Sequence, residues 1–133
     1  MKLPLHRQSA VQLAALIANG EAAPETVTRS FIDAIHERER DIQAFAWFDA
    51  DRAIAAAREL NLVSRRGPLH GLPFVVKDNI DTADVPTSYG SPIYEGHAPP
   101  SDAACVALLK DAGAFVLGKT VLPEFANFTP GPT

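Results

Sequence analysis

Two short apolar runs in the second half of the chain constrain its fold more than any other feature. The run F-V-V at 74–76 ends at Lys77, and the run A-F-V-L at 114–117 follows Gly113. Turn-forming residues bound both runs, as is typical of strands, and the run at 114–117 is expected to be buried. The segment between them is long enough to hold a helix, and a parallel pair of strands needs such a crossover. The order strand, helix, strand therefore predicts two parallel, neighbouring strands in an α/β fold.

The crossover is predicted to consist of a long loop and a helix. Residues 78–100 hold four prolines and two glycines, which favours a loop. Beyond them, four apolar residues recur at the spacing of one helix face, namely Cys105, Leu108, Leu109 and Ala112. We expect that face to be buried, with Cys105 as a small core residue. Ser101 or Asp102 is expected to cap this helix.

The first 66 residues are predicted to form a mainly helical lead-in. Ser9 and Gln12 have the spacing of a capping box. Pro24 suits the first turn of a second helix, because proline lacks the N–H that would be unpaired there. Residues 44–48 are predicted to be extended, and Asp49 to cap an alanine-rich helix. Residues 67–133, which hold nine of the eleven prolines, are predicted to form the βαβ segment.

The charge distribution argues against a nucleic-acid partner. Residues 1–66 hold nine Lys or Arg and nine Asp or Glu, so their formal charges balance. Residues 67–133 hold three Lys, no Arg and seven Asp or Glu. A nucleic-acid surface carries clustered basic side chains, which this acidic second part does not offer.

Membrane insertion and secretion are not expected either. No apolar run approaches the roughly 20 residues that cross a bilayer, and the first residues lack the apolar core of a signal peptide. The single cysteine rules out an internal disulfide and a cysteine-built zinc site, and the four histidines lack metal-ligand spacing. We therefore expect a cytoplasmic protein with no metal site and no cofactor.

One nucleotide-binding pattern is present in an unfavourable structural context. Residues 113–120 read G-A-F-V-L-G-K-T and match the P-loop pattern. A P-loop follows a strand and wraps a phosphate with free backbone N–H groups. Here the first glycine follows a predicted helix, and the four residues after it are predicted to be the strand itself. Because strand N–H groups are used within the sheet, nucleotide binding is disfavoured.

Lys77 is the residue that the predicted fold singles out for chemistry. It ends a strand, and ligands collect at the carboxyl ends of strands in α/β sheets. Apolar surroundings would lower the pKa of its ammonium group and free it to act as a base. The alternative is a plain ion pair with Asp78 or Asp81 at the strand end. Together with Asn79, these Asx residues are expected to orient the lysine's loop by bonding to the backbone.

The sequence from Gly67 onward carries an ordered series of blocks rather than one motif. They are GPLHGLPFVVKDNID at 67–81, TSYGS at 87–91, YEGH at 94–97, SDAA at 101–104, AGA at 112–114, GKT at 118–120 and EFA at 124–126. Together they resemble the amidase-signature family. The segment PGPT at 130–133 resembles the turn before that family's Gly/Ser-rich segment, and the first half of the chain is similar more loosely.

The resemblance implies the front part of an amidase-signature fold, with N-terminal helices followed by a βαβ unit of a mixed sheet. It also implies hydrolysis of a carboxamide C–N bond by a lysine and two serines, one of them in a cis peptide. Lys77 matches the catalytic lysine. In that scheme the neutral lysine takes a proton from the cis-peptide serine, which relays it from the nucleophilic serine. Water then releases the acyl group, and backbone N–H groups stabilise the oxyanion. Lys119 matches a position outside this trio, and we expect it to have a structural or loop-anchoring role.

The serines of this chain do not match the two that the resemblance requires. They are Ser9, Ser30, Ser64, Ser88, Ser91 and Ser101, whereas the family's pair lies in a segment beyond the position of Thr133. We therefore expect residues 1–133 to be an incomplete N-terminal part of a single amidase domain, inactive alone. The alternative is a truncated, non-catalytic α/β binding or structural module. The identity of the small-molecule amide, the choice between an amidase and part of an amidotransferase, and the oligomeric state stay open.

Overall fold

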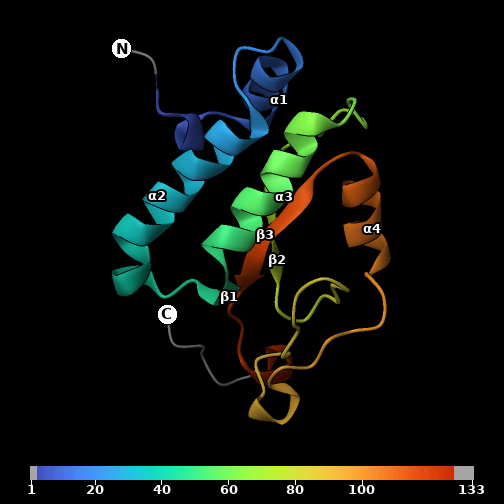
Figure 1. The fold of residues 1–133 in the computed structure, drawn as a ribbon. Coiled ribbons are helices and arrows are strands. Elements are labelled where there is room, and N and C mark those ends of the chain that lie inside the picture. The colour runs from blue at the N-terminus through green and yellow to red at the C-terminus, as the bar shows by residue number, and fades with distance from the viewer. Residues whose placement is uncertain (1–2, 128–133) are drawn as a thin grey trace.

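The chain folds into four α-helices and a three-stranded sheet within residues 3–127, the part that the computed structural model describes (Figure 1). The helices are α1 (Ala10–Ala18), α2 (Pro24–Ile42), α3 (Ala50–Leu62) and α4 (Ala104–Asp111), and the strands are β1 (Phe45–Phe48), β2 (Pro73–Lys77) and β3 (Phe115–Thr120). Short 3-10 turns lie at Leu5–Arg7, Pro92–Tyr94 and Glu124–Ala126. The predicted α/β class is confirmed.

The sheet is mixed, with β3 in its centre and the strand order β1-β3-β2. β2 runs parallel to β3, so that Lys77 lies opposite Thr120, and this confirms the predicted pair of parallel neighbours. β1 runs antiparallel to β3 on the other side, with Phe45 opposite the same Thr120. Gly118 allows this close approach, because a Cβ there would lie 2.8 Å from the ring of Phe45. The helical lead-in thus contributes a strand to the sheet of the second part.

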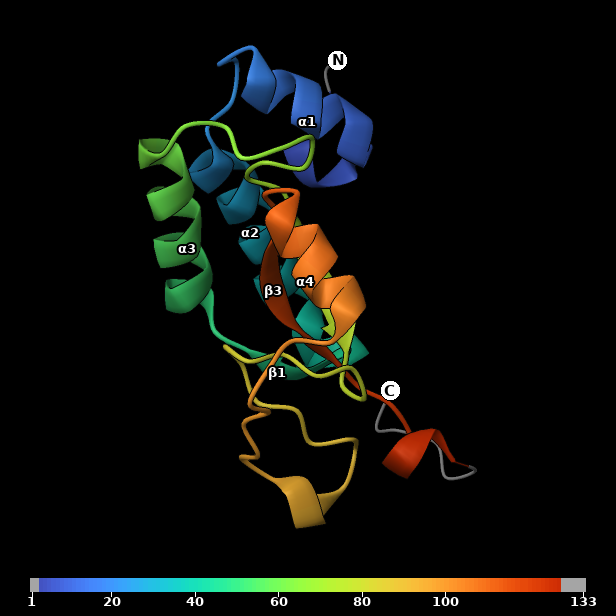
Figure 2. The same ribbon diagram turned by 90° about the vertical axis from the view of Figure 1, so that its right-hand side faces the viewer.

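Helices cover both faces of the sheet. On one face α2 and α3 pack through Ile32, Ala53 and Ala57 against Phe115 and Leu117 of β3. On the other face Val106 of α4 packs against Val76 and Val116. Figure 2 shows α4 on the opposite side of β3 from α2 and α3. Burial of apolar side chains in these two layers stabilises the fold by about 25 cal/mol per Å² of apolar surface removed from water.

The helix starts follow the predicted local chemistry. The Ser9 hydroxyl accepts a hydrogen bond from the Gln12 N–H at 3.2 Å, and the Gln12 side chain accepts one from the Ser9 N–H at 2.9 Å. This is the predicted capping box. Pro24 occupies the first turn of α2, and the Asp49 carboxylate accepts from the Arg52 N–H at 2.9 Å at the start of α3. All three predictions are confirmed.

The prediction for α4 is wrong in its face and in its cap. Cys105 is exposed and Leu108 is 69% exposed, whereas Val106 is 1% exposed. The helix is apolar over more than one stripe, so its spacing alone does not choose the buried face. The N-cap is Ala103, without a side-chain cap. Asp102 instead accepts a hydrogen bond from the Ala83 N–H at 2.8 Å and forms an ion pair with a lysine of α4.

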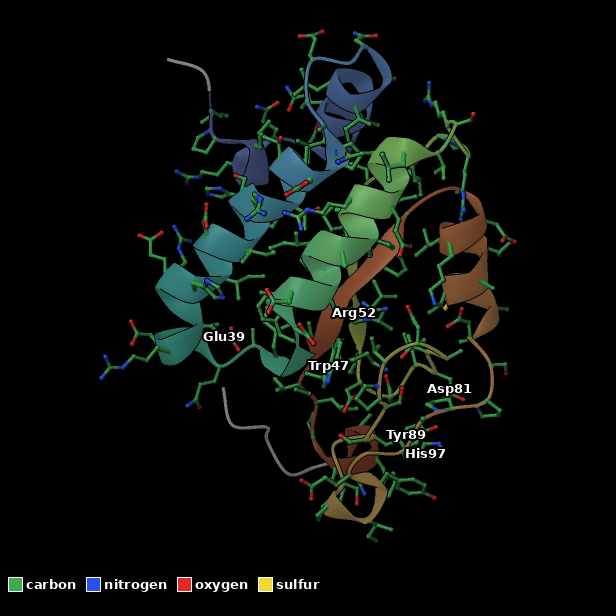
Figure 3. All side chains as sticks on the ribbon, in the orientation of Figure 1. Glu39, Trp47, Arg52, Asp81, Tyr89 and His97 are labelled. Carbon is green, nitrogen blue, oxygen red and sulfur yellow. The ribbon has the colours of Figure 1, made fainter. Side chains whose placement is uncertain are left out.

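Two side chains fix the chain's path around β1, and Figure 3 labels both. The Glu39 carboxylate of α2 accepts a hydrogen bond from the Phe45 N–H at 2.8 Å, where the strand begins. The Arg52 guanidinium of α3 lies 5.7 Å from the ring centre of Trp47 and donates to the Val116 carbonyl at 3.1 Å. These contacts tie the lead-in to the central strand. None of the helices in the described residues is long and apolar enough to cross a membrane.

Candidate functional site

The segment that matches the P-loop pattern is a strand in the structure. Residues 115–120 form β3, whose backbone pairs with β1 and β2 on its two sides. Its N–H groups therefore lie between two strands and do not form a phosphate cradle. The Lys119 side chain is 0% exposed, so it does not reach a ligand in solvent. The prediction that this segment is the strand itself is confirmed.

Lys119 is bound by the loop that follows β2. Its Nζ donates to the Thr87 hydroxyl at 2.6 Å, to the Ile80 carbonyl at 2.7 Å and to the Thr82 hydroxyl at 3.1 Å. The Asp78 carboxylate lies 3.6 Å away and forms a buried ion pair with it. The expected loop-anchoring role of Lys119 is confirmed by these contacts.

These contacts suit the ammonium form of Lys119. The Thr82 hydroxyl donates its hydrogen to the Val85 carbonyl at 2.9 Å, so its oxygen is an acceptor toward the lysine. Three acceptors then use all three hydrogens of an ammonium group. Burial lowers the pKa of Lys119, and the Asp78 carboxylate acts in the opposite direction. A cation with every hydrogen bound has no free lone pair, so Lys119 is unsuited to act as a base.

Asp78 is the residue that connects this cluster to Lys77. It is 2% exposed, and its carboxylate accepts from the Ser88 N–H at 3.2 Å and from the Ser88 hydroxyl. Its own N–H donates to the Thr120 carbonyl at 3.0 Å, and its carbonyl accepts from the Tyr89 N–H at 2.9 Å. The predicted role of an Asx residue in orienting the lysine's loop is confirmed for Asp78.

Lys77 is exposed at the end of β2, which corrects the expectation of apolar surroundings. Its carbonyl accepts from the Ile80 N–H at 3.0 Å and begins the turn that follows the strand. Within residues 3–127, Lys77 forms no ion pair. The alternative of a pair with Asp78 or Asp81 is wrong, because the first carboxylate faces Lys119 and the second accepts from the Tyr89 hydroxyl.

Tyr89 was missed as a site residue because only the tertiary fold brings it to the lysine turn. Its hydroxyl donates to Asp81 at 2.6 Å, and this bond, with burial, raises the pKa of Tyr89 to about 12. Its ring lies 5.1 Å from that of Tyr94 and 6.1 Å from that of His97. Figure 3 shows Tyr89 and His97 side by side in the loops beyond the strand ends.

The two loop histidines lie in different places. His97 belongs to the aromatic group beside the lysine turn, and its carbonyl accepts from the Thr87 N–H at 2.9 Å. His70 is buried elsewhere, where its ring bonds the Leu60 carbonyl at 3.0 Å and the Arg66 N–H at 3.3 Å. In the part of the chain that the structure describes, no group of three His, Cys, Asp or Glu side chains could hold a metal ion.

A groove of about 410 Å³ opens at the end of the sheet where β3 finishes and β1 begins. Phe45 and Leu122 line its apolar side, and Ser88 and Ser91 supply polar atoms. Ser88 is the residue that bonds Asp78, so the groove adjoins the turn of Lys77. The strand ends thus combine a concave surface, an accessible lysine and a fixed turn, which is the usual place for a ligand in such a sheet.

Comparison with known proteins identifies the family. The family model described as Amidase matches residues 26–132, which is most of the chain. The chain belongs to the amidase family. The resemblance in the ordered sequence blocks is thereby confirmed.

Curated relatives and solved structures agree with this assignment. The A-subunit of glutamyl-tRNA(Gln) amidotransferase from Acidothermus cellulolyticus is 44% identical, over 97% of this chain and 28% of that protein. Its counterpart in Mycobacteroides abscessus is 40% identical, again over 97% of this chain and 28% of that protein. The native peptide amidase of Stenotrophomonas maltophilia superposes with a TM-score of 0.84 at 38% identity, over 93% of this chain and 26% of that one.

The chain spans about a quarter of the length of these relatives. Its helices and mixed sheet correspond to the amidase fold over that span. An amidase family protein of Bacillus anthracis str. Ames gives the same result, with a TM-score of 0.79 at 30% identity over 90% of this chain and 25% of that one. The predicted front part of an α/β amidase fold is therefore confirmed.

Proposed function

We propose that this chain is part of an amide hydrolase and that Lys77 is its catalytic lysine. The supporting observation is that the three lysines in residues 3–127 differ in exposure and in hydrogen-bond and ion-pair partners. Lys119 is buried with every hydrogen bound, and Lys110 pairs with Asp84 and Asp102. Lys77 alone is exposed and without an acidic partner in the described residues. A proton acceptor needs such an uncommitted amine.

The proposed reaction is hydrolysis of a carboxamide by a Ser-cisSer-Lys mechanism. Neutral Lys77 takes the proton of the cis-peptide serine, and that serine takes the proton of the nucleophilic serine. The nucleophile's oxygen forms a bond to the amide carbon, the C–N bond breaks, and the leaving amine receives the proton. Water then cleaves the acyl-enzyme to a carboxylic acid. The scheme uses side chains and water and calls for no cofactor.

Both serines are proposed to lie outside this chain's 133 residues. Membership in the amidase family and the span of about a quarter of its relatives' length support this assignment. Residues 1–133, with a helical lead-in at 1–66 and the βαβ segment at 67–133, would then be one part of a single amidase domain. We propose that this part alone hydrolyses no amide. A cytoplasmic location stays a prediction.

The test begins with the coding sequence downstream of Thr133. A Gly/Ser-rich segment within the next few dozen codons supports the enzyme, whereas a stop codon there favours the non-catalytic α/β module. The full-length protein is then assayed for ammonia release from primary carboxamides. Replacing Lys77 by alanine should lower kcat by about 10²–10⁴-fold, the usual contribution of a positioned proton acceptor.

A matched control removes the same charge elsewhere. Lys110→Met, at a partly buried position of α4, should leave kcat unchanged, because Lys110 only pairs with Asp84 and Asp102. Trapping with hydroxylamine should yield a hydroxamate from the unmodified enzyme and none from Lys77→Ala. Turnover by Lys77→Ala at the rate of the unmodified enzyme would refute the role of the lysine.

A further inference from the structure

Lys119 cannot act on the same ligand as Lys77, because the two side chains leave the sheet on opposite faces. Lys119 lies beside Val76 in the register of β2 and β3, and Lys77 lies beside Thr120. Successive residues of a strand point to opposite faces. Val76 is buried in the cluster under α4, and Lys119 is bound on that side by the loop. Any effect of Lys119 on chemistry at Lys77 is therefore indirect.

Burying a charged group at position 119 costs desolvation free energy that packing alone does not offset. An apolar side chain of similar volume would often be equally stable or more stable in a buried site. Lys119 instead collects acceptors from Ile80, Thr82 and Thr87, and it faces the carboxylate of Asp78. All four belong to the one loop that begins directly after Lys77. The charge therefore organises that loop.

Asp78 transmits this organisation to Lys77 through the adjoining peptide bond. Its N–H is held by Thr120, its carbonyl by Tyr89, and its carboxylate by Ser88 and Lys119. Four contacts of Asp78 thus hold the backbone directly after Lys77 in place. A shift of about 1 Å in a catalytic group can cost about 10²-fold in rate, so such fixation has a measurable effect.

We propose that Lys119 and Asp78 form a buried positioning pair that holds the turn carrying Lys77 in its working geometry. This inference rests on the proposed catalytic function of Lys77. It makes Lys119 and Asp78 positioning residues, since neither touches the reacting atoms. It also gives the lysine of the P-loop-like segment a function that requires no nucleotide.

The first measurement follows the turn itself by NMR of the full chain. Amide hydrogen exchange is recorded at the two turn amides, Asp78 and Tyr89, whose N–H groups bond the Thr120 and Asp78 carbonyls, and at the amides of α2 as a reference. In Lys119→Met, exchange at the two turn amides should rise by about tenfold or more beyond any change in α2, as expected when charge-assisted hydrogen bonds are lost. The Lys77 ε-methylene resonance should move as well.

Lys110→Met is the control for the loss of one positive charge, and it should change neither the turn amides nor the Lys77 resonance. Exchange at Asp78 and Tyr89 that rises only in step with α2 would overturn the proposal, because it would show a general loss of stability. If Lys119→Met does not fold, Thr87→Val removes one acceptor and keeps the charge. That variant should accelerate the same two amides, and unchanged rates there would equally overturn the proposal.

The second measurement separates positioning from binding in the full-length enzyme. In Lys119→Met, kcat should fall by about tenfold or more while KM stays within about threefold, because the pair affects the position of Lys77 and not the substrate's contacts. Adding Lys119→Met to Lys77→Ala should cause no further loss. An unchanged kcat in Lys119→Met would overturn the proposal. If Lys77→Ala is itself fully active, the proposed function fails, and the exchange data still decide whether the pair holds the turn.

Discussion

Replacing Lys119 by methionine tests how much of the fold depends on one buried charge. Methionine keeps most of the side-chain length and removes the ammonium group. Three hydrogen bonds to Ile80, Thr82 and Thr87 are then lost, and the carboxylate of Asp78 remains buried without its partner. Breaking a buried pair in this way costs about 3–5 kcal/mol of unfolding free energy. Domains are typically stable by only about 5–15 kcal/mol, so this is a large fraction.

The assay is urea unfolding at pH 7, followed by far-UV circular dichroism. The midpoint should fall by the amount that about 3–5 kcal/mol implies, with an unchanged m-value, since the surface exposed on unfolding stays the same. Lys110→Met is the matched control. Its partly exposed ion pairs with Asp84 and Asp102 should contribute no more than about 1 kcal/mol.

A double variant identifies the source of the cost. In Asp78→Asn with Lys119→Met no carboxylate is left unpaired, so the loss should be smaller than the sum of the two single losses by about 0.5–3 kcal/mol. Strict additivity would show that Asp78 and Lys119 do not interact. A cost for Lys119→Met equal to that of Lys110→Met would refute the reasoning as a whole.

Three further predictions concern other parts of the fold. Gly113→Ala should lower the free energy of unfolding by about 2 kcal/mol or more, because the residue has φ +98° and a Cβ there would lie 2.7 Å from the His70 Cα. Its control is Gly96→Ala, which has φ +74° but open space around the Cβ, and which should cost about 1 kcal/mol in the same urea assay. The bond to Asp81 raises the pKa of Tyr89 to about 12, so its contribution to stability should be complete below pH 10 and lost as the pH rises toward 12. Tyr89→Phe should reduce the loss of unfolding free energy over this pH range. An unchanged dependence of stability on pH would show that the bond does not contribute. Cys105 is exposed and should react with Ellman's reagent without denaturant at the rate of a surface thiol, whereas protection until unfolding would restore the buried assignment.

Helix starts could be predicted from the sequence wherever residues close to one another in the chain determine them. The capping box of Ser9 and Gln12, the proline at the start of α2 and the cap at Asp49 all depend on groups within four residues. The strand order was partly predictable, because the long crossover with a helix between two apolar runs favours parallel neighbours. The buried face of α4 was not readable, since Val106 and Leu108 are equally apolar and only packing on Val76 and Val116 distinguishes them.

The sequence by itself determined the order of strands and helices and the family, because apolar periodicity and ordered sequence blocks can be recognised without the tertiary structure. It placed Lys77 at the end of one strand and Lys119 near the end of another, both after apolar runs. Only the tertiary structure decided which of them is buried. Lys119 lies on the face of the sheet that the loop after β2 covers, whereas Lys77 leaves the sheet on the opposite face and is exposed. Burial and pairing depend on residues up to about forty positions away, so no local pattern could separate the anchoring lysine from the accessible one.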